Sequence, residues 1–368
     1  MSINFNLLKP SASMEVTKLA GELKKQGKKI FPLGAGDTHF APPAAIMQKM
    51  ANLPAGFSHY TNAEGIESLR SQIAQKHGGC EAKDVLLVPG LKQGLYYALA
   101  AIQGKKLCIL EPAWLGYEAA AVLADYDTIS INTYTKGWEL QLAKQPFDAI
   151  IICSPNNPDG KIWSEQILLY ILQAAKLYNA WIITDFIYDR YIFEGSLAVN
   201  KVVCEYEKLI IGNGFSKSHA MTGFRAGYMI CKAVALVNSM IVMQQNLATC
   251  VAGISQYLLI DEVNADDEIK QNAAYYQKNR DLVLEIFPEW EPYKPQGGFY
   301  YFIDLGIYGI SDGQLFCADL LQKTGVALVP GSAYGKGFNS YVRLSFSIDT
   351  ETLIEGLRIM RIFIDEKN

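Results

Sequence analysis

The sequence predicts an α/β protein with a mostly parallel sheet and a second, smaller α+β domain. Short apolar runs alternate with amphipathic helical patterns through the middle of the chain, and the pattern changes from residue 281 onward. The 368 residues, of which 50% are hydrophobic, supply enough apolar side chains for the cores of two domains. This composition excludes a disordered chain and a small disulfide scaffold.

Seven short apolar runs are expected to form the main sheet, at 84–89, 106–110, 127–132, 148–153, 181–185, 208–212 and 226–230. Helical periodicity between these runs predicts helices at 92–103, 114–124 and 164–178, which would cover both faces of a largely parallel sheet. Parallel sheets of this kind bind ligands at the carboxyl ends of their strands. We therefore expect a site in the loops that begin at Pro89, Glu111, Ser154, Asp185 and Gly212.

The smaller domain is expected to contain strands at 298–304 and 340–347 and helices at 312–323 and 350–366. A helix at 13–26, which ends at Gly27, is expected to pack on it. The predicted large domain spans 41–265, and the small domain combines 1–40 with 266–368.

Residues 233–260 carry no charge, but polar side chains interrupt them too often for a membrane span. We therefore expect this segment to form one long helix that is buried between domains or subunits.

The charge balance argues against a nucleic-acid partner. Lys and Arg number 33 against 37 Asp and Glu, the formal net charge is −4, and no basic stripe is visible. The seven cysteines are scattered without CxxC spacing, which indicates reduced core residues and no metal site. The first residues lack the apolar core of a signal peptide, so we expect a cytoplasmic protein without a membrane partner.

The most specific motif is GFSKSHAMTGFRAG, residues 214–227. Lys217 follows a predicted strand, and Arg225 stands just before the next one. A lone Lys and Arg beside a turn would ordinarily be two surface cations. A lysine amine can, however, form a Schiff base with an aldehyde, and an arginine fork suits a phosphate.

The whole motif resembles the lysine signature of the class I and II aminotransferases, the fold-type I enzymes that use pyridoxal 5′-phosphate (PLP). The resemblance implies the PLP-dependent transferase fold of type I, with the cofactor aldehyde on Lys217 and its phosphate on Arg225. Gly214 departs from the pattern, because several relatives have a phosphate-binding Ser or Thr there. Ser216 is the neighbouring residue expected to compensate.

Two further loops match the family's contacts to the cofactor ring. Asp185 ends the apolar run WIITD, and Tyr188 follows in D-x-x-Y spacing. The resemblance assigns the ring nitrogen to Asp185 and the ring oxygen to Tyr188. In SPNNPDGKIW, it assigns Asn157 to the ring oxygen and the substrate carboxylate.

The phosphate and the ring face are expected to contact two other loops. PGLKQGLYYAL predicts a helix start at which the backbone amides of Leu91 and Lys92 bind an anion, as the resemblance also implies. In EPAWLGY, Trp114 matches the aromatic residue that stacks over the ring in the family.

The remaining matches concern the substrate and the subunit arrangement. In YVRLSFSI, the resemblance implies that Arg343 clasps the α-carboxylate of the substrate, although an ordinary exposed arginine is the competing interpretation. In FPLGAGDTHFAPP, Gly36 would allow close approach of the backbone to the substrate. In YTNAEGIESLR, Tyr60 would reach the phosphate of the neighbouring chain in a homodimer.

The resemblance implies a PLP-dependent aminotransferase that moves an amino group between an α-amino acid and a 2-oxo acid by a ping-pong mechanism through a Lys217 aldimine. Another PLP reaction on the same fold stays open, namely elimination, racemisation, cyclisation or oxidation. A dehydrogenase fits less well, because Gly34 and Gly36 lack the third glycine of a dinucleotide fingerprint. A binding module without chemistry is the alternative from another class, and the side chain of the substrate stays open.

Overall fold

A computed structural model describes residues 5–8 and 10–367. Its strands are β1 Val85–Val88, β2 Lys106–Glu111, β3 Asp127–Asn132, β4 Ala149–Cys153, β5 Trp181–Asp185, β6 Leu209–Gly214, β7 Gly227–Ile230, β8 Tyr300–Asp304, β9 Val329–Pro330 and β10 Tyr341–Ser345. Its α-helices are α1 Ala12–Lys25, α2 Ala44–Ala51, α3 Glu67–His77, α4 Leu91–Ile102, α5 Gly116–Leu123, α6 Glu165–Leu177, α7 Val199–Val202, α8 Val234–Leu247, α9 Gly253–Leu259, α10 Asp266–Ile286, α11 Gly313–Thr324 and α12 Thr350–Asp365.

The main sheet has seven strands in the order β1-β7-β6-β5-β4-β2-β3, which confirms the predicted α/β class. The pairs from β3 through β6 are parallel, whereas β7 runs antiparallel to both β6 and β1. Because β7 is reversed, its first residue lies at the same edge of the sheet as the last residue of β6, and Gly214 pairs with Gly227.

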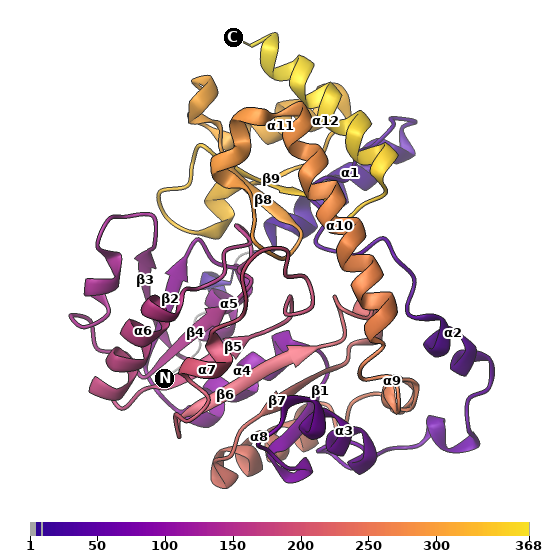
Figure 1. Cartoon of the computed structure of the whole chain (residues 1–368), viewed down its shortest axis with the longest axis vertical. Helices are drawn as coiled ribbons and strands as arrows, with labels where there is room; N and C mark the ends of the chain where they lie inside the picture. The colour runs from indigo at the N-terminus through magenta and orange to yellow at the C-terminus, as the bar shows by residue number, and fades with distance from the viewer. Residues whose placement is uncertain (1–4, 9, 368) are drawn as a thin grey trace.

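Both faces of the sheet are covered, as the continuous apolar strands require. In β4 all five residues are buried. Ile151 packs into the core cluster that contains Leu95 of α4, whereas Ile150 and Ile152 pack into the cluster that contains Leu168 of α6. Successive side chains of a strand point to opposite faces, so α4, α5 and α8 cover one face, and α6 and α7 cover the other (Figure 1).

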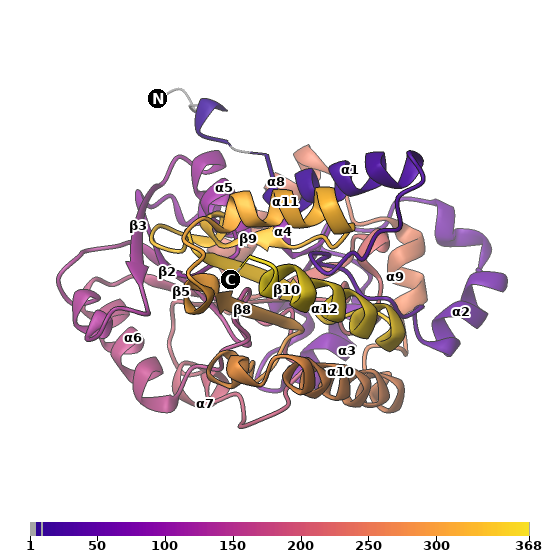
Figure 2. The same cartoon turned by 90° about the horizontal axis from the view of Figure 1, so that it is seen from above.

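A three-stranded antiparallel sheet, β8-β10-β9, forms the second layer together with the helices of the C-terminal part. Asp312 caps α11 by accepting a hydrogen bond from the Leu315 amide at 2.9 Å, and Gly325 ends that helix at a φ of +83°. The predicted N-terminal helix is confirmed as α1, whose Ala20 packs against Leu321 and Ala327. Figure 2 shows α1 beside α11.

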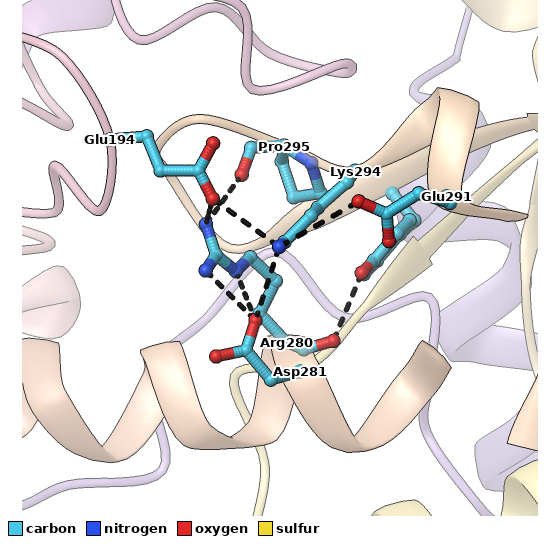
Figure 3. A network of polar contacts seen from close by, with 7 residues as sticks. Glu194, Arg280, Asp281, Glu291, Lys294 and Pro295 are labelled. Carbon is cyan, nitrogen blue, oxygen red and sulfur yellow. Dashed lines mark hydrogen bonds and ion pairs between the residues drawn. The ribbon is translucent and has the colours of Figure 1, made fainter. Parts of the chain in front are cut away.

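A cluster of charged side chains ties α10 to the loop that follows β5 (Figure 3). The buried guanidinium of Arg280 lies 2.9 Å from Glu194 and 2.8 Å from Asp281, and it donates to the carbonyl of Pro295 at 3.1 Å. Lys294 approaches Glu194 to 3.4 Å. Segments that lie far apart in the sequence are therefore held together beside the loops that carry the expected site.

The uncharged segment 233–260 differs from its prediction, because it forms two helices, α8 and α9, rather than one. The chain turns between them, where Thr249 has a φ of +62° and a Cβ on Gly253 would lie 2.5 Å from the Phe57 carbonyl oxygen. Burial is also incomplete, since Val242 and Leu247 are more than half exposed in the single chain. No helix in the described residues is long and apolar enough to cross a membrane.

Other differences are smaller. Helix α5 begins at Gly116 rather than at 114, and β8 begins at Tyr300 rather than at 298. The sequence patterns did not predict α2, α3, α7, α10 or the two-residue strand β9. The domain boundaries after residues 40 and 265 stay a prediction, and the expected domain ends at residues 1–4 and 368 lie outside the described residues.

Candidate active site

The loops at the carboxyl ends of β2, β4, β5 and β6 bring most of the predicted residues together. The lysine amine of Lys217 interacts electrostatically with Arg225 of the same loop, with Asp185 at the end of β5 and with Arg343 of β10. Parallel sheets bind ligands at the carboxyl ends of their strands, and residues that are distant in the sequence come together at this edge of the sheet as expected.

Asp185 is the last residue of β5 and is 3% exposed. Its carboxylate accepts a hydrogen bond from the Tyr117 hydroxyl at 2.7 Å and another from the Ile187 amide at 3.1 Å. Burial raises the pKa of Asp185 to about 6, although both hydrogen bonds and the charge of Lys217 act in the opposite direction. A buried carboxylate of this kind is suited to a cationic partner.

Lys217 lies in the loop between β6 and β7, and its amine donates a hydrogen bond to the carbonyl of Gly36. Its own carbonyl accepts a hydrogen bond from Tyr191 at 2.9 Å, which fixes the backbone of the loop. Burial lowers the pKa of Lys217 to about 8, with Arg343 and Arg225 acting in the same direction. A neutral, nucleophilic amine is therefore accessible near physiological pH.

Arg343 in β10 is 2% exposed, so the exposed-arginine interpretation is wrong. Its guanidinium donates to the Asn157 side-chain oxygen at 3.1 Å and to the Gly34 carbonyl at 2.9 Å, while its buried Nε has no hydrogen-bond partner in the described residues. The Asn157 amide donates to the Tyr188 hydroxyl at 3.4 Å. Arg343, Asn157 and Tyr188 thus form one continuous polar row.

A second group of cations gathers at the start of α4. Gly90 precedes the helix with a φ of +84°, and Arg225 lies against it, donating to the Thr222 carbonyl at 2.8 Å. Lys92 lies close enough to Arg225 that burial and the arginine charge together lower its pKa. Because Gly90 has no side chain, it cannot cap the backbone N–H groups in the first turn of α4. These N–H groups, together with the nearby cations, favour binding of an anion.

Trp114 follows β2 and contacts both Tyr117 and Lys92. Its ring meets Tyr117 edge-on, with centroids 5.4 Å apart, and the Lys92 amine lies 5.1 Å from its centroid. A Cβ on Gly116 would lie 2.4 Å from the indole, so glycine leaves the space that the indole occupies. Trp114 is therefore linked through Tyr117 to Asp185.

Four other residues that the sequence analysis names are placed less centrally. Ser216 is half-buried beside Lys217, and Gly36 contributes its carbonyl to the lysine amine. Tyr60 is 86% exposed, so its phenol is not packed into the pocket of its own chain. Gly214 lies against the backbone of β7, where a Cβ would be 3.1 Å from the Ala226 carbonyl oxygen.

Two tyrosines of the site were given no role by the sequence patterns. Tyr117 holds Asp185, and Tyr300 lies 3.2 Å from the Tyr188 hydroxyl. Both occur within motifs that the sequence analysis singled out, EPAWLGY and PQGGFYYF, although their partners lie far away in the sequence, at and just after the end of β5. Only the folded arrangement of these segments identifies the contacts.

Comparison with known proteins gives one family throughout. The family model described as aminotransferase class I and II matches residues 28–359. An aspartate aminotransferase of Thermotoga maritima is 30% identical over 376 residues, covering 97% of each chain. A probable aspartate/prephenate aminotransferase of Rickettsia felis is 31% identical and covers 98% of this chain and 96% of its own.

Solved structures agree. A Methanococcus jannaschii protein, described as similar in its active site to kynurenine aminotransferases, superposes with a TM-score of 0.88 at 29% identity, over 99% of this chain and all of that one. Aspartate aminotransferase from Thermus thermophilus with maleate also has a TM-score of 0.88, at 25% identity, over 98% of this chain and 99% of its own.

Proposed function

The chain belongs to the class I and II aminotransferases, and from this premise we propose how its residues divide the work of the reaction. It is a PLP-dependent enzyme that moves an amino group from an α-amino acid to a 2-oxo acid in two successive half-reactions. The meeting of Asp185, Lys217 and Arg343 in one cluster is the observation that supports the division of roles proposed below.

The residues present fit the cofactor. When bound, it supplies an aldehyde that condenses with amines and a ring that accepts electrons from the substrate α-carbon. Asp185 would pair with the ring nitrogen, and the uncapped start of α4 with Arg225 would hold the phosphate. Tyr188 and Asn157 would contact the ring oxygen, and Trp114 would cover the ring face.

Lys217 is proposed to have two tasks. Its amine would first hold the aldehyde and would afterwards take the proton from the substrate α-carbon, acting as base and then as acid. The pKa of about 8 supports both tasks, because the amine changes its protonation near neutral pH. The Gly36 carbonyl, which accepts a hydrogen bond from Lys217, would orient the free amine.

Arg343 is proposed to bind the α-carboxylate. Its buried guanidinium still has an unpartnered Nε–H, and Asn157 holds it on one side. The expected consequence is that Arg343→Ala lowers kcat/KM for an amino acid. The loss should correspond to about 2 to 5 kcal/mol of transition-state stabilisation, the usual cost of breaking a desolvated charge pair. An amine that lacks the carboxylate should be affected much less, whereas equal losses would indicate a folding role.

The reaction itself is tested with purified protein loaded with PLP. Aspartate is the first donor to try, because relatives are named aspartate aminotransferases. One equivalent of amino acid should convert the bound cofactor to its amine form and release one equivalent of 2-oxo acid, and a second 2-oxo acid should reverse this. Elimination or racemisation would turn over the amino acid without this stoichiometry, and Lys217→Ala is the inactive control.

We further propose a cytoplasmic homodimer. The exposed Tyr60, at the position from which family members reach the neighbouring phosphate, supports the dimer. No disulfide links the cysteines of the described residues, which supports a reducing compartment.

A further inference from the structure

Tyr300 is a buried residue of the candidate site that lies next to both Arg343 and Tyr188. Its side chain is 1% exposed. The guanidinium carbon of Arg343 lies 4.0 Å from the centre of its ring, and its hydroxyl lies 3.2 Å from that of Tyr188. One side chain therefore contacts both the arginine proposed for the substrate carboxylate and the tyrosine proposed for the cofactor ring.

The strand register explains this position. Arg343 of β10 is directly opposite Phe302 of β8, and Ser345 is opposite Tyr300. Tyr300 is thus the diagonal neighbour of Arg343 on the same face of the sheet, within reach of a long side chain. A flat ring face beside a buried guanidinium attracts it and restricts its tilt. The hydrogen bonds to Asn157 and Gly34 then fix the rotation within that plane.

The hydroxyl has a separate effect. Tyr188 has one proton to donate, and its oxygen can accept hydrogen bonds. The Asn157 amide already donates to it at 3.4 Å. When Tyr300 donates as well, the proton of Tyr188 is left to point toward a third partner. Burial raises the pKa of Tyr300, which keeps this donor protonated.

We propose that Tyr300 is a positioning residue, whose ring holds the Arg343 guanidinium for the carboxylate and whose hydroxyl directs the Tyr188 proton toward the ring oxygen of the cofactor. The inference rests on the proposed function of this site. It predicts two effects that separate when the ring and the hydroxyl are removed one at a time.

Two substitutions test the two parts. Tyr300→Phe keeps the ring and removes the hydroxyl, whereas Tyr300→Leu removes both. The first readout is calorimetric affinity of the loaded enzyme for maleate and for 3-phenylpropionate, two carboxylates that lack an amine. The second is the pH midpoint of the absorbance of the bound cofactor, which reports hydrogen bonding to its ring oxygen.

The expected results differ between the variants. Tyr300→Phe should leave carboxylate affinity within about twofold and raise the absorbance midpoint by roughly half a pH unit, the effect of one weakened hydrogen bond. Tyr300→Leu should show the same midpoint shift and a roughly tenfold weaker carboxylate affinity, because the buried cation–π contact is lost. Compared with Tyr300→Leu, the Tyr300→Phe variant thus restores the carboxylate affinity but not the absorbance midpoint.

Tyr301→Phe is the matched control. Tyr301 is the next residue of β8, is fully buried, and donates its hydroxyl to the Arg280 carbonyl at 2.9 Å. This variant also loses a buried hydrogen bond, so its melting temperature should fall, but neither readout should change.

Three outcomes would overturn the proposal. In the first, Tyr300→Leu changes the two readouts no more than Tyr301→Phe does. In the second, the phenylalanine and leucine variants lose carboxylate affinity equally. In the third, the wild type binds neither carboxylate. None of the measurements needs turnover, so absence of transamination would reject the proposed reaction while leaving the positioning role to be judged on its own readouts.

Discussion

Lys217 is surrounded by groups that make its amine unusually easy to deprotonate. Burial lowers its pKa to about 8. In cofactor-free protein, its reaction with trinitrobenzenesulfonate should therefore increase through about pH 8, well below the pH at which an ordinary lysine becomes reactive. Peptide mass spectrometry across a pH series measures this, with the exposed Lys136 as internal control. Identical pH profiles for the two lysines would contradict the assignment.

Asp185 has the opposite shift, since burial raises its pKa to about 6. Below about pH 4 it is protonated in both folded and unfolded chains and contributes no difference. As pH rises to 6, the unfolded chain releases the proton first, so ionisation destabilises the cofactor-free fold by up to about 3 kcal/mol. Asp185→Asn removes this destabilisation.

The cofactor-free Asp185→Asn protein should accordingly melt higher than the wild type at pH 7.5, and the gap should close as the pH falls toward 4. With cofactor present the order should reverse, because the carboxylate is then paired. Thermal unfolding of both proteins with and without PLP decides this. A gap that is independent of pH would show that Asp185 is already compensated in the empty site.

At the scale of single residues, the sequence was sufficient where a motif carries chemistry. The motifs predict Lys217, Asp185, Asn157 and Arg343 as site residues, and the structure brings them together, although their roles stay predictions. Tyr300 received no role, because its partner is fixed by the pairing of β8 with β10. A contact set by strand register is not encoded in local spacing.

Among the elements, the start of α4 depends on a single glycine. Gly90 has a φ of +84°, and a Cβ there would lie 2.2 Å from an Arg225 nitrogen. Gly90→Ala should therefore displace Arg225 and weaken affinity for both PLP and inorganic phosphate, by roughly tenfold or more. Equilibrium dialysis with each ligand provides the measurement.

Gly78→Ala is the control for this substitution. Gly78 also has a positive φ, at +68°, but no atom lies within 4 Å of its missing Cβ. It should lower stability through backbone strain alone and leave phosphate affinity unchanged. Equal loss of affinity in both variants would mean that strain, and not Arg225, explains the effect.

At this same scale, the seven strands of the main sheet could be predicted together with β8 and β10, because alternating apolar runs and helices are a strong signal. The break between α8 and α9 could not. Residues 248–252 contain neither glycine nor proline, and the turn is set by packing against the Phe57 backbone. Tertiary contacts outweigh local propensity there.

At the scale of the whole molecule, the proposed dimer makes a prediction about mixed subunits. Lys217→Ala chains and Tyr60→Ala chains should each be inactive, yet a mixed dimer would contain one site with both residues intact. Random exchange of equal amounts should restore roughly a quarter of wild-type activity. Because Tyr60 is exposed, its substitution should leave each chain folded. No recovery despite exchange, demonstrated by mass spectrometry, would refute the shared site.

The pairing of β1 with β7 also determines when the phosphate site can form during synthesis of the chain on the ribosome. Val88 pairs with Gly227, so the start of α4 and Arg225 meet only after both strands have been synthesised. A nascent chain that stops at the end of β6 has Gly90, Leu91 and Lys92 but lacks the guanidinium of Arg225, and its first strand has no neighbour in the sheet. Cofactor capture is therefore a late event in biogenesis, and hydrogen exchange in the β1–β7 ladder should slow when the anion arrives.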